Sequence, residues 1–112
     1  LVISYTTSPA ATVEYNGSTT YKALVFDEGH PIQVEGAAIL KNAKNPEGAK
    51  KFMDFFISDE AQSVLPLTQW MYPANKNVEL PESYKIGAAT PAKTVSADSE
   101  KVSEAVAKIM AQ

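Results

Sequence analysis

The chain has 112 residues, enough for one domain or for part of a larger one, and its 45% hydrophobic and 21% charged residues are typical of a globular protein. The net charge is −3 and all ten basic residues are lysines, which disfavours a nucleic-acid binder because such proteins usually present a basic, arginine-containing face. Cysteine is absent, which excludes disulfides, thiolate metal sites and cysteine nucleophiles, and no apolar run is long enough to span a membrane.

The first part of the chain predicts two strands and one helix. Residues 1–5 are mostly apolar and β-branched, which indicates a short buried strand already under way at the first residue, so we expect the chain to be part of a longer protein. Ser8 is a favourable N-cap, and the pattern predicts a helix to about Tyr15. Residues 21–26 predict a second strand, and residues 27–31 predict a turn.

The middle of the chain predicts a strand followed by two helices. Residues 32–40 begin with alternating polarity and end in an apolar run, as a strand does when it enters a covered sheet. Asn45 and Ser58 are N-cap residues that begin the two helices, and Pro66 is expected to end the second. The expected buried faces are Ala49, Phe52, Met53 and Phe56 on the first helix, and Ala61, Val64 and Leu65 on the second.

The C-terminal part predicts a long loop and a last helix. Residues 68–91 contain repeated prolines, and loops of this length are usually functional or lie over another part of a molecule. A helix is expected from about Asp98, with an apolar stripe of Val102, Ala105, Val106, Ile109 and Met110. The order of elements indicates an α/β fold with a few strands and three or four helices.

The only histidine, His30, is the one residue around which a metal or catalytic site could be built. Asp27, Glu28 and Glu35 lie near it in sequence, but nothing in their spacing imposes a coordination geometry, and a solvated turn is the simpler interpretation. No hydrolase elbow and no phosphate-binding loop is present. We therefore expect no enzymatic activity, no bound metal and no cofactor.

Two groups of side chains point to ligand binding. The hydroxyl residues Thr7 and Ser8 precede a helix N-terminus, where free N–H groups and the helix dipole favour an anion, although a plain capping motif is the simpler explanation of this stretch. Tyr5, Trp70 and Tyr72 are aromatic residues near the ends of predicted elements or in the long loop. Such rings either hold a cation over their faces or seal the edge of a core.

Three stretches of the chain carry a resemblance to a known family. Residues 35–62 resemble the C-terminal part of periplasmic solute-binding proteins of ABC importers. Residues 4–10 and 28–35, followed by residues 69–73, are similar to the thiamine-binding branch of that family. The sequence departs from this branch at Ala11, where a second tyrosine is usual.

The resemblance implies the C-terminal part of a type II periplasmic binding-protein fold, a two-lobed clamshell with the ligand between its lobes. Residues 1–30 would form the crossover and hinge region, and residues 31–112 would complete the first lobe. Tyr5 and Trp70 would line the cleft and contact a cationic, thiamine-like ligand, with Thr7, Ser8 and Tyr72 near it. The implied partners are this ligand and an ABC permease, and the implied location is the periplasm or the outer face of the membrane, with a signal sequence upstream.

The sequence leaves other hypotheses open about the ligand and the function. Ferric iron is an alternative ligand of the same superfamily, although its iron sites typically use adjacent tyrosines and Tyr5 is followed by Thr6. A hydrolase or metalloenzyme that uses His30 is an alternative of a different class. We also expect the isolated chain to form a dimer or a domain-swapped assembly, because a strand edge without its neighbour tends to pair with another copy.

Overall fold

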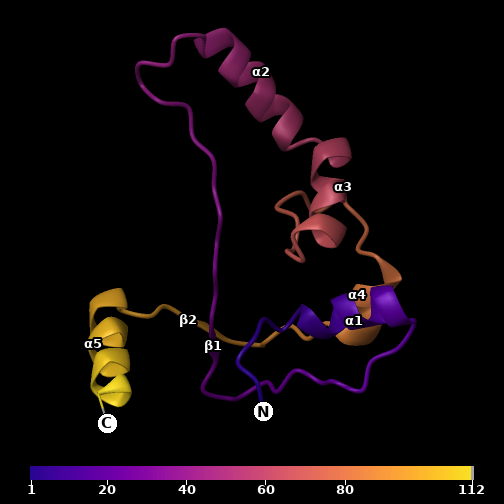
Figure 1. Cartoon of the computed structure of the whole chain (residues 1–112). Helices are drawn as coiled ribbons and strands as arrows, with labels where there is room; N and C mark the ends of the chain where they lie inside the picture. Colours follow the sequence, from indigo (N-terminus) through magenta and orange to yellow (C-terminus); the bar gives the residue numbers. More distant parts are fainter. Residues whose placement is uncertain (112) are drawn as a thin grey trace. The chain divides into compact units, whose positions relative to one another are not determined.

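The computed structural model describes residues 1–111 and divides into two compact units (Figure 1). Unit 1 comprises residues 1–24 and 35–90, and unit 2 comprises residues 25–34 together with the chain from Pro91 onward. Over the described residues the fold is mixed α/β, with five helices and two short parallel strands. The expected α/β class is confirmed, with five helices among the described residues where three or four were expected.

The first helix of unit 1, α1 (Ser8–Asn16), lies where the sequence predicts a helix. Its N-cap residue is Thr7 rather than Ser8, so the predicted cap is wrong by one position. The Thr7 side chain makes no cap hydrogen bond; its hydroxyl donates instead to the main-chain oxygen of Trp70. The helix ends at Gly17, whose left-handed backbone lets its N–H reach the Val13 oxygen at 2.7 Å.

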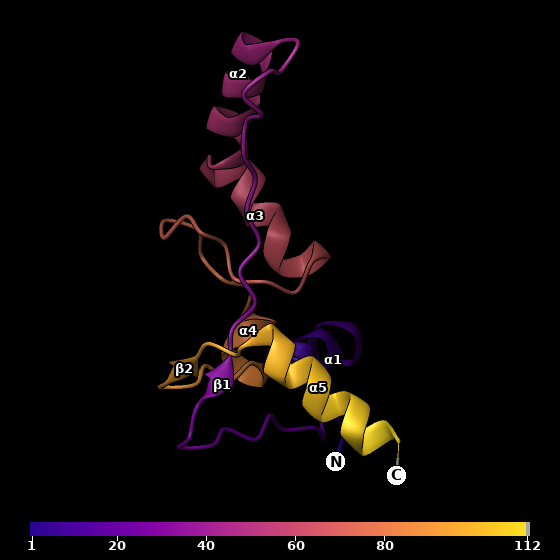
Figure 2. The same ribbon diagram turned by 90° about the vertical axis from the view of Figure 1, so that its left-hand side faces the viewer.

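A short helix that the sequence did not predict, α4 (Glu82–Gly87), packs against α1 (Figures 1 and 2). The two backbones approach closely because Gly87 has no side chain: a Cβ there would lie 2.7 Å from the Ala10 nitrogen. Just after α4, the Ala89 N–H donates to the Thr6 oxygen at 3.0 Å. Pro9, Ala10 and Val13 of α1 are buried, so this contact forms the main core of unit 1.

Helices α2 (Pro46–Phe56) and α3 (Asp59–Thr68) follow each other along the chain, and their predicted starts are confirmed. The Asn45 side chain accepts the Gly48 N–H at 2.9 Å, and the Ser58 hydroxyl accepts the Ala61 N–H at 3.3 Å. The predicted buried faces are wrong for this chain, because no residue of α2 is buried and α3 buries Gln62 and Pro66 instead.

The predicted end of α3 is also wrong, since the helix continues through Pro66 to Thr68. A proline inside a helix removes one hydrogen bond and usually stops or kinks the helix. Here the Pro66 ring is fully buried and its carbonyl oxygen accepts the Tyr84 hydroxyl at 2.8 Å. Tertiary packing therefore offsets the lost bond.

The predicted strands at residues 1–5, 21–26 and 32–40 are absent from the structure; these residues are extended or irregular and largely exposed. A strand is stable only when its N–H and C=O groups pair with a neighbouring strand, and the described residues offer these segments no such partner. Apolar pattern alone therefore overpredicted sheet in this chain.

Unit 2 contains the two strands, β1 (His30–Pro31) and β2 (Thr94–Val95), which pair in parallel with His30 opposite Thr94. Gly29, just before β1, has a φ of 101°, which L side chains rarely adopt, and a Cβ there would lie 3.0 Å from the Val95 side chain and 3.1 Å from Lys93. The last helix, α5 (Ser99–Met110), begins where predicted, with the Asp98 carboxylate accepting the N–H groups of Glu100 and Lys101. Its apolar stripe is exposed.

Among the described residues, no helix has both the length and the apolar character needed to cross a bilayer.

Candidate functional site

The backbone at Trp70 is the most unusual feature of unit 1. Trp70 follows α3 and has a φ of +55°, a left-handed conformation that is rare and costly for a bulky residue. The hydroxyl of Thr7 donates to the Trp70 carbonyl oxygen at 2.8 Å, and Thr7 is only 6% exposed. This hydrogen bond holds the strained loop against the start of α1.

Four aromatic side chains, Tyr15, Trp70, Tyr72 and Tyr84, form a continuous group that we call the aromatic cluster. Trp70 stacks on Tyr84, with ring centroids 6.3 Å apart and planes inclined by 10°. Tyr15 meets Trp70 edge to face at 5.8 Å and 60°, and Tyr72 meets Tyr84 at 5.5 Å and 78°. These are the offset-stacked and edge-to-face arrangements that aromatic pairs favour. The contacts give the Trp70 indole a defined orientation.

Tyr84 is the anchor of the aromatic cluster. It is 3% exposed and its hydroxyl donates to the Pro66 oxygen at 2.8 Å. Burial, and to a lesser degree the nearby Tyr72 phenol, raises the pKa of Tyr84 to about 12, because the phenolate would lose solvation there. Tyr84 is therefore a neutral hydrogen-bond donor under physiological conditions, and its ring stacks on the Trp70 indole.

Gln62 holds the other end of the Trp70 loop. Its side chain is buried; its amide nitrogen donates to the Phe56 oxygen at 2.8 Å and its amide oxygen accepts the Ala74 N–H at 2.8 Å. Asn75 adds a hydrogen bond to the Asp59 carboxylate at 2.7 Å. The segment from Trp70 to Asn75 is thus tied to α1 at its start and to α3 at its end.

The structure brings three of the five sequence-predicted residues into one region. Thr7 contacts Trp70 through its hydroxyl, Trp70 and Tyr72 both belong to the aromatic cluster, and the Tyr72 hydroxyl lies 3.1 Å from the Thr90 hydroxyl. Tyr5 lies just before α1 and is 66% exposed. Ser8 pairs with the Ser4 hydroxyl at 2.6 Å. The ligand-binding roles of all five remain predictions.

Sequence reasoning missed two residues of the aromatic cluster, Tyr15 and Tyr84. Tyr15 could have been found from its position, because it lies one helical turn after Ala11, where a second tyrosine is usual in the family that the sequence resembles. Tyr15 is therefore on the same helix face as Ala11. Tyr84 had no local signal, because its helix is short and lies inside a stretch that composition marks as loop.

The start of α1 has fewer free donors than an anion site needs. The Ser8 N–H donates to the Tyr5 oxygen and the Ala10 N–H donates to the Thr7 oxygen, both at 3.0 Å. Pro9 has no N–H at all. The helix dipole remains, but with these N–H groups already bonded the start of α1 offers few donors to a phosphate.

His30 is engaged in its own turn. Its Nε2 accepts the Phe26 N–H at 2.8 Å, and its ring stacks on Phe26 at 5.4 Å and 19°. In the described part of the chain no three His, Asp or Glu residues are close enough together to hold a metal ion. These contacts give His30 a structural role in the turn before β1.

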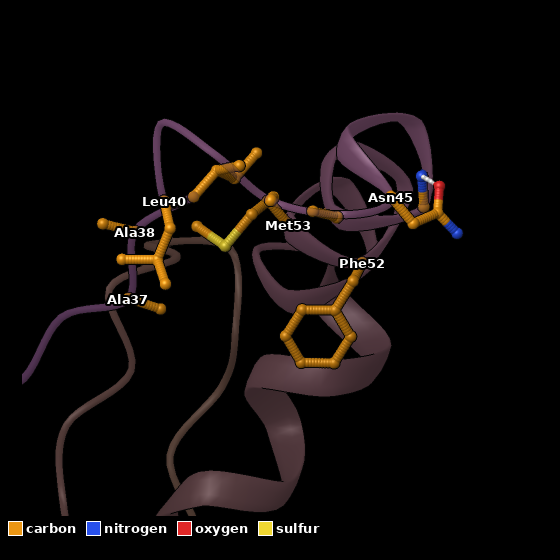
Figure 3. Close-up of a pocket in the computed structure, with 10 residues that line it drawn as sticks. Ala37, Ala38, Leu40, Asn45, Phe52 and Met53 are labelled. Atoms are coloured by element: carbon orange, nitrogen blue, oxygen red, sulfur yellow. Dashed lines mark hydrogen bonds between the residues drawn. The ribbon is translucent and has the colours of Figure 1, made fainter.

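An apolar hollow of about 430 Å³ lies between α2 and the extended segment that precedes it (Figure 3). Leu40, Phe52 and Met53 line it (Figure 3), together with Asn45, whose side chain caps α2. The hollow is lined by residues 37–53 and shares no residue with the aromatic cluster. It has almost no polar group that would orient a ligand, so it does not add to the site around Trp70.

Comparison with known proteins gives concordant matches. The chain is 45% identical over 85 residues to the thiamine-binding periplasmic protein of Escherichia coli (strain K12), which covers 76% of this chain and 26% of that protein. It is 43% identical over 95 residues to the protein of that name in Salmonella typhimurium, covering 85% of this chain and 28% of the relative. The chain thus spans little more than a quarter of the length of these relatives.

A solved structure of a periplasmic thiamin binding protein superposes with a TM-score of 0.74 and 38% identity, covering 94% of this chain and 32% of the solved one. Residues 1–63 match the family of bacterial extracellular solute-binding proteins. More than half of the chain lies in that match, so this chain belongs to the bacterial extracellular solute-binding protein family.

Proposed function

We propose that this chain is the C-terminal part of an extracytoplasmic solute-binding subunit of an ABC importer, which captures thiamine or a phosphate ester of thiamine and delivers it to a membrane permease. The observation that carries this proposal is the likeness over 94% of the chain, at 38% identity, to a periplasmic thiamin binding protein. The full-length receptor would act in the periplasm, as the names of the relatives indicate for those proteins.

The proposed architecture is a type II two-lobed clamshell. In it, residues 1–30 supply the crossover and hinge region, and residues 31–112 complete the first lobe. Residues 1–5 and 32–40 support this arrangement, because their apolar and alternating sequence patterns suit strands of a larger sheet. The exposed apolar face of α2 has the character of a surface that packs on such a sheet.

The chemistry of the aromatic cluster suits a thiamine-like ligand. Thiamine carries a permanent positive charge on a flat aromatic ring, and such cations are attracted to the faces of tryptophan and tyrosine. The absence of arginine agrees with this, since a guanidinium nearby would repel the ligand. In our proposal Tyr5 and Trp70 contact the cationic ring, Tyr72 lies beside them, and Ser8 faces the hydroxyl or phosphate end of the ligand.

Thr7 has a more specific part in this proposal than in the sequence analysis. Its buried hydroxyl is already donated to Trp70, so it acts through the position of the indole. Strained backbone of the kind seen at Trp70 is typically retained where a side chain must be aimed at a ligand. The Thr7 hydrogen bond and the Tyr84 stack together keep that side chain in place.

Magnitudes show that this chain alone is not the whole site. A nanomolar ligand requires about 12 kcal/mol, whereas each cation–π contact supplies about 0.5 to 2 kcal/mol. The aromatic residues here account for only a fraction of that free energy. The rest of the full-length receptor must supply the remaining contacts, including any carboxylate that faces the thiazolium ring.

Isothermal titration of the full-length receptor with thiamine, its monophosphate and its pyrophosphate tests the proposal. We expect saturable binding of at least one of them, weakened about tenfold or more by Trp70→Ala and less by Trp70→Phe, which keeps an aromatic face. Absence of heat with all three compounds would reject the thiamine assignment. A visible absorption band on addition of ferric citrate would then favour the iron alternative.

A further inference from the structure

We propose that Tyr15 is a ligand-contacting residue that forms, with Trp70, the aromatic corner against which a flat cationic ring packs. This inference rests on the proposed function, because it assigns a further residue to the same site. It starts from one contact, the edge-to-face approach of the Tyr15 and Trp70 rings at 5.8 Å and 60°.

Tyr15 differs from the other partner of Trp70 in its exposure. Tyr84 is 3% exposed and its hydroxyl is used by Pro66, so it belongs to the core that supports the indole. Tyr15 is 76% exposed although its ring touches Trp70. A ring that serves only to fill a core would be covered; this one is held by a single aromatic neighbour and keeps most of its surface available to a ligand.

The position of Tyr15 is well defined in spite of its exposure. It lies in the last turn of α1, whose C-terminal end is closed by Gly17. The helix is held in turn by its close contact with α4 through Gly87. Tyr15 and Trp70 thus come from two segments that are each held in place, α1 by the α4 contact and the Trp70 loop by Thr7 and Gln62.

The residue one turn before Tyr15 on the same face is Ala11, which carries only a methyl group. A large residue there would compete with Tyr15 for the surface that both can cover. With alanine at this position, Tyr15 is the aromatic ring that α1 presents beside Trp70. Two rings inclined by 60° offer a planar cation one ring face and one flank.

The test uses the full-length receptor and four variants, Tyr15→Ala, Tyr15→Leu, Tyr15→Phe and Tyr21→Ala. Leucine keeps apolar volume without a ring, and phenylalanine keeps the ring without the hydroxyl. Tyr21 is the matched control, because it is a comparably exposed tyrosine that forms none of the ring contacts found among the described residues. Circular dichroism checks that each variant is folded, and titration with thiamine gives the dissociation constant.

We expect Tyr15→Ala and Tyr15→Leu to raise the dissociation constant for thiamine about three- to thirtyfold, and Tyr15→Phe and Tyr21→Ala to change it less than twofold. Should Tyr15→Ala fail to fold, the comparison of Tyr15→Leu with Tyr15→Phe decides the question alone. Equal affinity of the leucine and phenylalanine variants would overturn the assignment of Tyr15. A wild-type receptor that binds no thiamine compound would instead overturn the proposed function, so the two failures are distinguishable.

Discussion

The Thr7 hydroxyl and the Trp70 main-chain oxygen, 63 positions apart in the chain, are joined by a hydrogen bond of 2.8 Å. It links the N-cap residue of α1 to a tryptophan with left-handed backbone. Because the chain contains one tryptophan, its fluorescence reports directly on this contact. The first predictions below use that property.

Replacement of Thr7 by valine removes the hydroxyl and keeps the shape of the side chain. We expect the free energy of unfolding of unit 1 to fall by about 1 to 3 kcal/mol, because the Trp70 carbonyl loses its donor in a part-buried setting. The Trp70 emission should also shift, since the loop loses its restraint. Thr7→Ser, which keeps the hydroxyl, is the matched control. Identical emission and stability for the valine and serine variants would contradict the positioning role of Thr7.

The contact between α1 and α4 depends on Gly87. A Cβ at this position would lie 2.7 Å from main-chain atoms of Pro9 and Ala10. The backbones of α1 and α4 could relieve this clash only by moving apart. We expect Gly87→Ala to lower the free energy of unfolding by about 1 to 3 kcal/mol in chemical denaturation. Gly36→Ala serves as the control, because a Cβ there meets no atom within 4 Å and should be neutral. Equal behaviour of the two variants would show that the helices do not approach as described.

The stability of unit 1 should decrease at alkaline pH because of Tyr84. Its pKa is raised to about 12 in the folded chain, whereas an unfolded tyrosine titrates near about 10. Below the unfolded-state pKa, Tyr84 is protonated in both the folded and the unfolded chain, and its full contribution to the free energy of unfolding is present. Between the two pKa values only the unfolded chain releases the Tyr84 proton, so the free energy of unfolding falls as the pH rises. The full loss corresponds to roughly 2 to 3 kcal/mol.

Urea unfolding followed by Trp70 emission, at intervals between about pH 9 and pH 12, measures this loss. The variant Tyr84→Phe lacks the titrating hydroxyl and should show a flatter dependence over the same range, although it starts from a lower stability because the Pro66 oxygen loses its donor. Parallel slopes for the wild type and the variant would assign the alkaline transition to other groups.

Self-association of the isolated chain is a further expectation. Apolar side chains are exposed in the segments predicted to be strands, including Ile3, Val34 and Leu40, and such segments pair with one another when no neighbour is provided. We expect sedimentation velocity to show dimers that increase with concentration, and Val34→Lys to reduce them. A single monomeric species at every concentration would contradict this expectation.

Sequence alone predicted the helices whose starts are governed locally. Asn45, Ser58 and Asp98 each cap a helix through N–H groups two or three residues ahead, so neighbouring residues contain all the required information. Trp70 and Tyr72 were also identified from sequence as candidate site residues, because large rings in a loop with no helical stripe are unusual. The family of the chain was visible in the same way, from short stretches of residues.

Tertiary structure decided the features that depend on partners distant in the chain. Residues 1–5 and 32–40 have strand-like patterns but form no ladder, because pairing needs a neighbour that pattern cannot supply. α3 continues through Pro66, whose ring is fully buried and whose carbonyl oxygen accepts the hydroxyl of Tyr84, 18 positions away. The place of Tyr15 beside Trp70 likewise results from the packing of α1 against the Trp70 loop. Two side chains far apart in sequence come into contact only when folding brings together the elements that carry them.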